Sequence, residues 1–444
     1  MSSSRAVATL GNGLREPLFV RAMQSGGMKA AEVGLGFVVV LLLARWLGAA
    51  EYGRYAVAWS VLSLVPVFGA LGLPQLLMRD GAVYEQDGMW GLRRGLLLSG
   101  LVYLALWGLL AAGVGIALIW GVLDLGMEDR WLYLLAVILA VPAMLLRVLG
   151  GWLLGRRRVV AGQLGEAVLR RGLVILFIGF AILTALRADA TNALMLQGAA
   201  LVLAAMAVAV LVIRDERSLP GAPPLLHLRR WGAGGASFLA IGALTVVMQH
   251  TDVLMLGSLV ATEDAGIYHL AARMAELAAL ALAAVNVVLA PLFARLAAAG
   301  EIARLHRIAV TSARLLTLLG LAALAGFAVF GGWLLGLFGV GFSDGRTALL
   351  ILAAAQVANL ACGSVALLLS MAGHAGATAR GMAAGAGANV ALNALLIPLY
   401  GIEGAALATG ASLILWNLIL LAAVGRKLNI DPSILGLGLR RRAA

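Results

Sequence analysis

The sequence predicts an all-helical protein that crosses a membrane twelve times. Three observations lead to this prediction: 62% of the 444 residues are hydrophobic, only 12% are charged, and the apolar residues lie in long continuous runs. A soluble domain carries about a quarter charged residues and fewer than half apolar ones. The composition therefore excludes a soluble enzyme, a disordered chain and a nucleic-acid-binding domain. About twenty apolar residues span a bilayer as a helix, so the chain has room for about a dozen spans.

Twelve apolar windows, separated by charged or turn-forming residues, mark the expected spans. Continuous apolar runs of this length are typical of helices, because barrel strands alternate polar and apolar residues. The spans expected in the first half of the chain are 28–47, 55–78, 95–119, 131–154, 167–186 and 193–213. Those expected in the second half are 232–256, 267–294, 315–338, 348–371, 381–399 and 405–424.

These windows divide the chain into two lobes of six spans each. The expected parts are an N-terminal segment 1–27, an N-lobe 28–213, a linker 214–231, a C-lobe 232–425 and a basic tail 426–444. The first apolar run is long enough to span and lacks a small-residue cleavage site, which indicates a retained first span rather than a cleavable signal. The linker contains the Pro/Gly-rich stretch 219–224 and marks the boundary between the lobes.

The basic residues predict the orientation of the chain. Of the 33 lysines and arginines, 26 fall in the terminal segments and the loops on one side, five in the opposite loops, and two, Arg147 and Arg273, inside spans. Such an excess marks the cytoplasmic side. We therefore expect both termini in the cytoplasm, as an even number of spans requires. The net charge of +12 reflects this topology rather than binding of nucleic acid.

A short motif repeats at half the length of the chain. The residues between the first two expected spans, 51–55, read Glu-Tyr-Gly-Arg-Tyr, and those between the seventh and eighth, 264–268, read Asp-Ala-Gly-Ile-Tyr. Both fit the pattern acidic-x-Gly-x-Tyr. Because six spans per half give the halves the same orientation, the pattern predicts a parallel repeat about an axis along the membrane normal. Two six-span lobes around a central path are a transporter architecture.

Enzyme chemistry finds little support in the sequence. There is no phosphate-binding glycine loop, no catalytic residue set and no cofactor motif, and the five histidines lie too far apart to predict a metal site. The lone Cys362 is interpreted as a small buried hydrophobe. A membrane-embedded glycosyl- or phosphotransferase needs acidic metal-binding pairs. The only acidic cluster, Asp124 with Glu128 and Asp129, is interpreted as a solvated turn.

Charges within the spans are the candidate functional residues, because ionised groups at membrane depth usually face water or a partner. Arg147 lies about 13 Å from the cytoplasmic edge, counted from Arg156 at 1.5 Å per residue. It faces either a water-filled cleft or helix carbonyls. Arg273 and Glu276 are three residues apart on one helical face and can pair. With Asp252 they form either a structural ion pair or one that breaks during transport.

Two further charges enter the first span from the cytoplasmic side. Lys29 and Glu32 are also three residues apart, and they are either a solvated helix end or part of the transport path. We take Arg147, Arg273 and Lys29 as candidate cations for an anionic substrate. Asp252, Glu276 and Glu32 are candidates for a coupling ion, H⁺ or Na⁺.

Four segments spread over the chain carry a resemblance to a known family. They are Leu-Ala-Arg-Trp-Leu-Gly-Ala-Ala-Glu-Tyr-Gly-Arg-Tyr at 43–55, Gly-Ala-Leu-Gly-Leu-Pro at 69–74, the residues 252–257 with 266–268 and 272–273, and Asn393 with 398–406. In these segments the chain resembles the oligosaccharide flippase (polysaccharide biosynthesis) family. The superfamily also holds multidrug and toxin extruders and lipid II flippases.

The resemblance implies a multidrug and toxin extrusion-like fold, in which two six-helix bundles enclose a V-shaped cavity that opens alternately to each side. It implies a polyprenyl-diphosphate-linked oligosaccharide as the substrate, moved from the cytoplasmic to the outer leaflet of a bacterial inner membrane during surface polysaccharide synthesis. Membrane lipids, a polysaccharide polymerase and glycosyltransferases are the implied partners. The alternative function is a multidrug or cation antiporter of the same superfamily, which predicts an acidic cavity instead of buried arginines.

Overall fold

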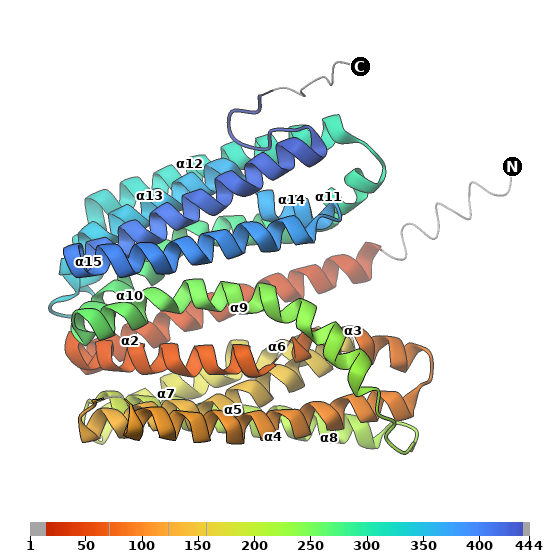
Figure 1. Cartoon of the computed structure of the whole chain (residues 1–444), viewed down its shortest axis with the longest axis horizontal. Helices are drawn as coiled ribbons and strands as arrows, with labels where there is room; N and C mark the ends of the chain where they lie inside the picture. The colour runs from red at the N-terminus through yellow and green to blue at the C-terminus, as the bar shows by residue number, and fades with distance from the viewer. Residues whose placement is uncertain (1–14, 71, 123, 157, 438–444) are drawn as a thin grey trace, which may run out of the picture. The chain divides into compact units, whose positions relative to one another are not determined.

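The computed structural model describes residues 15–70, 72–122, 124–156 and 158–437 (Figure 1). Within these ranges the side chains of 15–26, 29–30, 67–68, 70, 159, 229–230 and 232–241 are not described. The described part of the chain is helical almost throughout and has no strand. The predicted all-helical class is confirmed.

The first half of the chain forms six helical passages. They are built from α2 (Arg15–Ala70), α3 (Leu73–Gln86), α4 (Trp90–Gly121), α5 (Met127–Gly155), α6 (Val159–Leu164), the π-helix η1 (Gly165–Leu169), α7 (Arg170–Leu183) and α8 (Ala190–Arg217). Gly48 has a φ of 72° and breaks α2 into two passages. Glycine suits this position because a side chain disfavours a positive φ.

The second half forms six more passages over the described residues. They are built from α9 (Leu228–Leu259), α10 (Thr262–Glu276), the 3₁₀ turn η2 (Leu277–Ala279), α11 (Leu280–Ala298), α12 (Ile302–Gly336), the 3₁₀ turn η3 (Phe342–Gly345), α13 (Arg346–Cys362), α14 (Val365–Met371) and α15 (Ala375–Leu428). Gly401, with a φ of 54°, breaks α15 as Gly48 breaks α2. The twelve predicted passages are therefore present.

Several element boundaries differ from the prediction. The predicted span 55–78 is divided, because α2 ends at Ala70 and α3 begins at Leu73 with a proline in its first turn. The charge count placed Arg170 and Arg171 among the 26 basic residues on the cytoplasmic side. The fifth passage begins at Val159, so both arginines lie inside a helical passage, which corrects that assignment. Residues 429–437 pack back on the chain: Arg314 Nε donates to the carbonyl of Ile434 at 3.1 Å.

Eight helices or helix runs in the described part of the chain are long and apolar enough to cross a membrane. They carry large apolar side chains that are exposed, such as Leu109, Val288, Val329 and Leu399. Aqueous solvent disfavours this much exposed apolar surface, whereas a lipid environment favours it. The chain is a multi-pass membrane protein.

The chain packs into two compact units. One contains Met1–Leu43 and Val61–Leu239, and the other contains Ala44–Ser60 and Ala240–Ala444. The second unit therefore includes the first copy of the repeated motif as well as the second copy. The glycines of the two copies, Gly53 and Gly266, touch each other there, and a Cβ atom on either would overlap backbone atoms. A close crossing of α2 with α10 explains why both copies carry glycine at this place.

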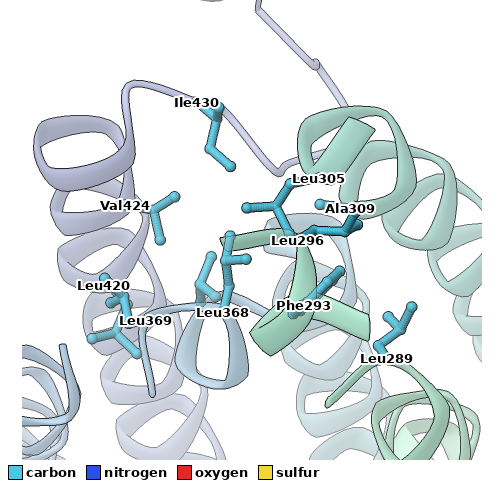
Figure 2. Packing of buried hydrophobic residues seen from close by; sticks show 11 residues of the cluster. Leu289, Phe293, Leu296, Leu305, Ala309, Leu368, Leu369, Leu420, Val424 and Ile430 are labelled. Carbon is cyan, nitrogen blue, oxygen red and sulfur yellow. The ribbon is translucent and has the colours of Figure 1, made fainter. Parts of the chain in front are cut away.

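The second unit has an apolar core near the end of α15 (Figure 2). Phe293 of α11 and Leu305 of α12 are fully buried there, together with Leu369 of α14 and Leu420 of α15. Ile430 follows α15 and extends the cluster. This packing holds the short helix α14 and the segment after α15 against three longer helices.

The first unit has a network of buried charges where α4 begins and α3, α5 and α8 end. Arg93 is 1% exposed, donates to Glu216 Oε1 at 2.7 Å, and lies 4.3 Å from the centre of the Trp152 ring. Arg156 joins Asp215 to Glu85 in the same network. Burial lowers the pKa of Arg156, but the hydrogen bond from its guanidinium to Asp215 and the nearby carboxylates raise that pKa above its ordinary value. The guanidinium therefore stays charged.

Removing one member of this network should destabilise the protein strongly. We expect Arg93→Ala to lower the Tm of the purified protein, because Glu216 loses its guanidinium partner in a buried site; such losses cost about 3–5 kcal/mol. The matched control is Arg304→Ala, which breaks the exposed pair of Arg304 with Glu301 and should cost less than about 1 kcal/mol. Equal shifts of Tm for the two variants would contradict this interpretation.

Candidate functional site

Candidate charged side chains within the helical passages lie in both units. The first unit contributes Arg147 and Glu166, with Glu32, Arg170 and Arg171 close by, and the second contributes Asp252, Arg273 and Glu276. Lys29 lies on α2, but its side chain is outside the described residues, so its role as a substrate cation stays a prediction.

Arg147 forms an ion pair with a residue that the sequence analysis did not single out. Its Nε lies 3.6 Å from Oε1 of Glu166, and the two side chains are 39% and 42% exposed. Arg147 is eight residues from the end of α5 at Gly155, which is about 12 Å along the helix. Half-exposed charges at this depth avoid lipid, so their open side is expected to face a hydrated path.

Glu166 lies in a π-helical turn, η1. A π-turn shifts the backbone hydrogen bonds by one residue and is often found at functional sites. The Arg171 guanidinium donates to the carbonyl oxygen of Glu166 at 2.9 Å and to that of Ala167 at 3.3 Å. The π-turn and the arginine that follows it therefore hold the Glu166 backbone in place.

The same arginine reaches the first helical passage. Arg171 Nη2 lies 3.2 Å from Oε1 of Glu32, so Glu32, predicted as a candidate for ion coupling, is ion-paired. Arg170 is buried and donates to Gln197 Oε1 at 3.3 Å. Arg170 and Arg171 were not predicted as site residues, because the charge count placed them in a loop although the predicted span 167–186 contains both. A signal was present for Arg170, which follows Glu166 by four residues, a spacing that places two side chains on one face of a helix.

In the second unit, Arg273 and Glu276 form the pair that their spacing predicts, with Arg273 Nη1 2.8 Å from Glu276 Oε2. The side chains are 33% and 43% exposed. Arg273 Nε also donates to His269 Nε2 at 3.4 Å, and His269 Nδ1 lies 2.9 Å from the hydroxyl of Tyr52. The pair ends α10 and immediately precedes the 3₁₀ turn η2, so another irregular turn lies beside a charged pair.

Asp252 is held by uncharged partners in the described part of the chain, and not by Arg273. The Tyr268 hydroxyl donates to Oδ2 at 2.6 Å, Asn393 Nδ2 donates to Oδ1 at 2.5 Å, and the Thr409 hydroxyl also donates to Oδ2. Asp252 is 4% exposed. A buried carboxylate without a cationic partner is stabilised by taking up a proton or a small cation. This is the arrangement expected of an ion site.

The comparisons with known proteins agree with this architecture. Residues 25–297, more than half of the chain, match the model of the polysaccharide biosynthesis protein family. The chain belongs to this family. Among curated proteins it is similar to the probable flippase AglR of Haloferax volcanii, with 26% identity over 190 residues, which are 42% of this chain and 40% of that protein. The match therefore spans less than half of that relative.

Two solved structures show the fold that this member of the polysaccharide biosynthesis family adopts. The inward-facing structure of a multidrug resistance MATE family transporter of the MOP superfamily is 13% identical, with a TM-score of 0.72 over 88% of this chain and 94% of that one. The inward closed structure of the lipid II flippase MurJ is 11% identical, with a TM-score of 0.67 over 90% and 87%. The predicted multidrug and toxin extrusion-like fold is confirmed.

The hydrogen bonds around Asp252 should be tightly interdependent. We expect Thr409→Val to lower the Tm of the purified family member, because the buried carboxylate loses one donor, a loss of about 1–3 kcal/mol. The matched control is Thr317→Val in the same unit, since the buried Thr317 hydroxyl donates only to Ala313 of its own helix at 2.7 Å. In an Asp252→Asn background the Thr409→Val effect should shrink. An effect of unchanged size there would contradict the coupling.

Proposed function

We propose that the protein is a flippase that moves a polyprenyl-diphosphate-linked oligosaccharide from the cytoplasmic to the outer leaflet of a bacterial inner membrane. The observation that carries the proposal is the pair of half-exposed arginines, Arg147 and Arg273, inside helical passages of a polysaccharide biosynthesis family member. Homologues named as flippases support it, and none of the relatives reported above is named as an enzyme.

Arginine suits a diphosphate headgroup. The guanidinium presents paired donors that match phosphate oxygens, and its bonds to charged oxygens are shorter and stronger than neutral ones. A glycan headgroup with two charges does not enter hydrocarbon without such partners. Arg147 and Arg273 belong to different units, so each unit supplies one of these two arginines.

Coupling to an ion is assigned to Asp252 in this proposal. Of the three predicted carboxylates, Glu32 and Glu276 are ion-paired with Arg171 and Arg273, whereas the described hydrogen bonds to Asp252 come from neutral groups. A proton or Na⁺ bound there drives transport if it binds one conformation more tightly than the other. The substrate lipids, and the polymerase and glycosyltransferases that act on the same glycan, are the proposed partners.

We propose that both termini lie in the cytoplasm, because the basic residues are in excess in the terminal segments and in the loops on the same side. We expect a reporter that is active only in the cytoplasm to be active when fused after Ala444. The same reporter inserted at Asp124, between α4 and α5, should be inactive. Activity at both positions, or at Asp124 alone, would contradict cytoplasmic termini.

Deletion of the gene tests the transport proposal directly in the native host. Lipid-linked glycan should accumulate on the cytoplasmic leaflet while the surface polysaccharide disappears. The wild-type gene should restore export, and the double variant Arg147→Ala/Arg273→Ala should restore it at least about tenfold less well, because each arginine contributes a charge-assisted bond. Arg304→Ala is the control, and membrane levels of every variant are compared by immunoblot.

The outcomes separate the function from the site. Normal surface glycan without accumulation, in a host with no second homologue, would contradict the flippase. Full rescue by the double variant would contradict the site alone.

A multidrug or cation antiporter is the second candidate. The observation in its favour is the buried acidic residue Asp252 in a fold shared with a multidrug transporter. It predicts drug resistance on overexpression and no glycan phenotype on deletion. The half-exposed arginines favour an anionic substrate instead.

A further inference from the structure

Three arginines and two glutamates of the first unit form one connected group. Arg147 pairs with Glu166, and Arg171 binds both the Glu166 backbone and the Glu32 side chain. Arg170 follows η1 directly, and its charge, like those of Arg147 and Arg171, acts on the Glu166 carboxylate. The group joins α2, α5, η1 and α7, and it carries one net positive charge.

The geometry of the pairs indicates how tightly each is held. Arg171 makes three hydrogen bonds, to Glu32 and to the carbonyl oxygens of Glu166 and Ala167, and is mostly buried. The Arg147–Glu166 contact is longer, at 3.6 Å between Nε and Oε1, and both side chains are about 40% exposed. Exposed ion pairs contribute little to stability, so this contact can be broken at low cost.

We propose that this group is a diphosphate-binding site gated by carboxylates. Glu166 and Glu32 stay ion-paired with the arginine guanidiniums until the diphosphate of the lipid substrate displaces them. The charges match. A diphosphate that bridges a lipid and a sugar carries two negative charges, as many as the two glutamates that it replaces. The phosphate oxygens of the substrate then accept hydrogen bonds from the same guanidinium groups that the carboxylate oxygens of the glutamates have left. This inference rests on the proposed function.

The two glutamates lower the free-energy cost of holding the guanidiniums in an apolar environment. Three unneutralised guanidiniums inside a membrane protein are costly, and the two glutamates neutralise two of the three charges while no substrate is bound. Because the carboxylates compete with the substrate, they also weaken its binding and so favour its release. Removing a glutamate should therefore strengthen binding, whereas removing an arginine should weaken it. A purely structural ion pair predicts no gain of affinity from either change.

The test uses the full-length protein in nanodiscs of zwitterionic lipid, with radiolabelled farnesyl diphosphate as the probe and farnesol as the uncharged control. We expect Glu166→Gln to tighten binding about tenfold and Arg147→Gln to weaken it about tenfold, since each change removes one competitor or one charge-assisted bond. Glu301→Gln, at the exposed pair with Arg304, should leave the affinity unchanged. Arg147→Lys, which keeps the charge, replaces Arg147→Gln if the latter does not fold, and should weaken binding less.

Inorganic pyrophosphate distinguishes the sources of the anion. If it competes with the probe and shows the same order of affinities across the variants, the site recognises the diphosphate itself. Failure to compete, with binding that farnesol also achieves, would overturn the proposal, because the lipid tail alone would then account for binding. Equal affinities of wild type and Glu166→Gln, or a loss of affinity in both glutamine variants, would overturn the gate.

The result can be read independently of the proposed function. If the gene deletion shows the glycan phenotype but Glu166→Gln and Arg147→Gln do not shift the affinity for farnesyl diphosphate in opposite directions, the proposed gate is wrong and the flippase function stands. If the opposite shifts are present but the deletion leaves lipid-linked glycan unchanged, the anion site stands and the flippase is wrong.

Discussion

The cost of holding an ionised group away from water governs the interior of this protein. Only 12% of the residues are charged, and the described charges inside helical passages are paired, hydrogen-bonded or half-exposed. Arg93 is enclosed by Glu216 and Trp152, Arg147 meets Glu166, Arg273 meets Glu276, and Asp252 is hydrogen-bonded by neutral side chains. Because an unpartnered charge costs several kcal/mol in such surroundings, these partnerships determine which helices lie together and which contacts a substrate must displace.

Irregular turns accompany the charged pairs within the passages. The π-turn η1 contains Glu166, and the 3₁₀ turn η2 follows Glu276. A further irregularity, Gly363 with a φ of 75°, divides α13 from α14. Irregular backbone is tolerated at membrane depth only where other groups satisfy it. Arg171 binds two carbonyls at η1, and Ile434 N–H donates to Ala361 O beside the break at Gly363. Each irregularity is thus a position where the helix can change without losing all its partners.

Local sequence patterns predicted the helices well and the site only in part. Apolar run length predicted twelve passages, and the motif at 51–55 and 264–268 predicted a repeat whose glycines, Gly53 and Gly266, touch. The spacing of Arg273 and Glu276 predicted their pair. The partners of Asp252 could not be predicted, because Asn393 and Thr409 are more than 140 residues away and meet it only through tertiary packing. The place of Arg170 and Arg171 was missed because they lie near the start of the predicted span 167–186 and were counted as loop charges, whereas the helical passage begins earlier, at Val159.

On the proposed function, the two units bind opposite charges in different ways. Asp252 has neutral donors and gains most from a cation, whereas the arginines around Glu166 already hold carboxylates and gain only by exchanging them. Helix α10 connects the cation site to the segment 44–60: Tyr268 binds Asp252, and the next residue, His269, binds Tyr52. An ion at Asp252 therefore acts on the helix that anchors this segment. Since coupling requires only that each ligand prefer one conformation, we propose this connection as the route from ion binding to movement of the chain, without any contact between ion and substrate.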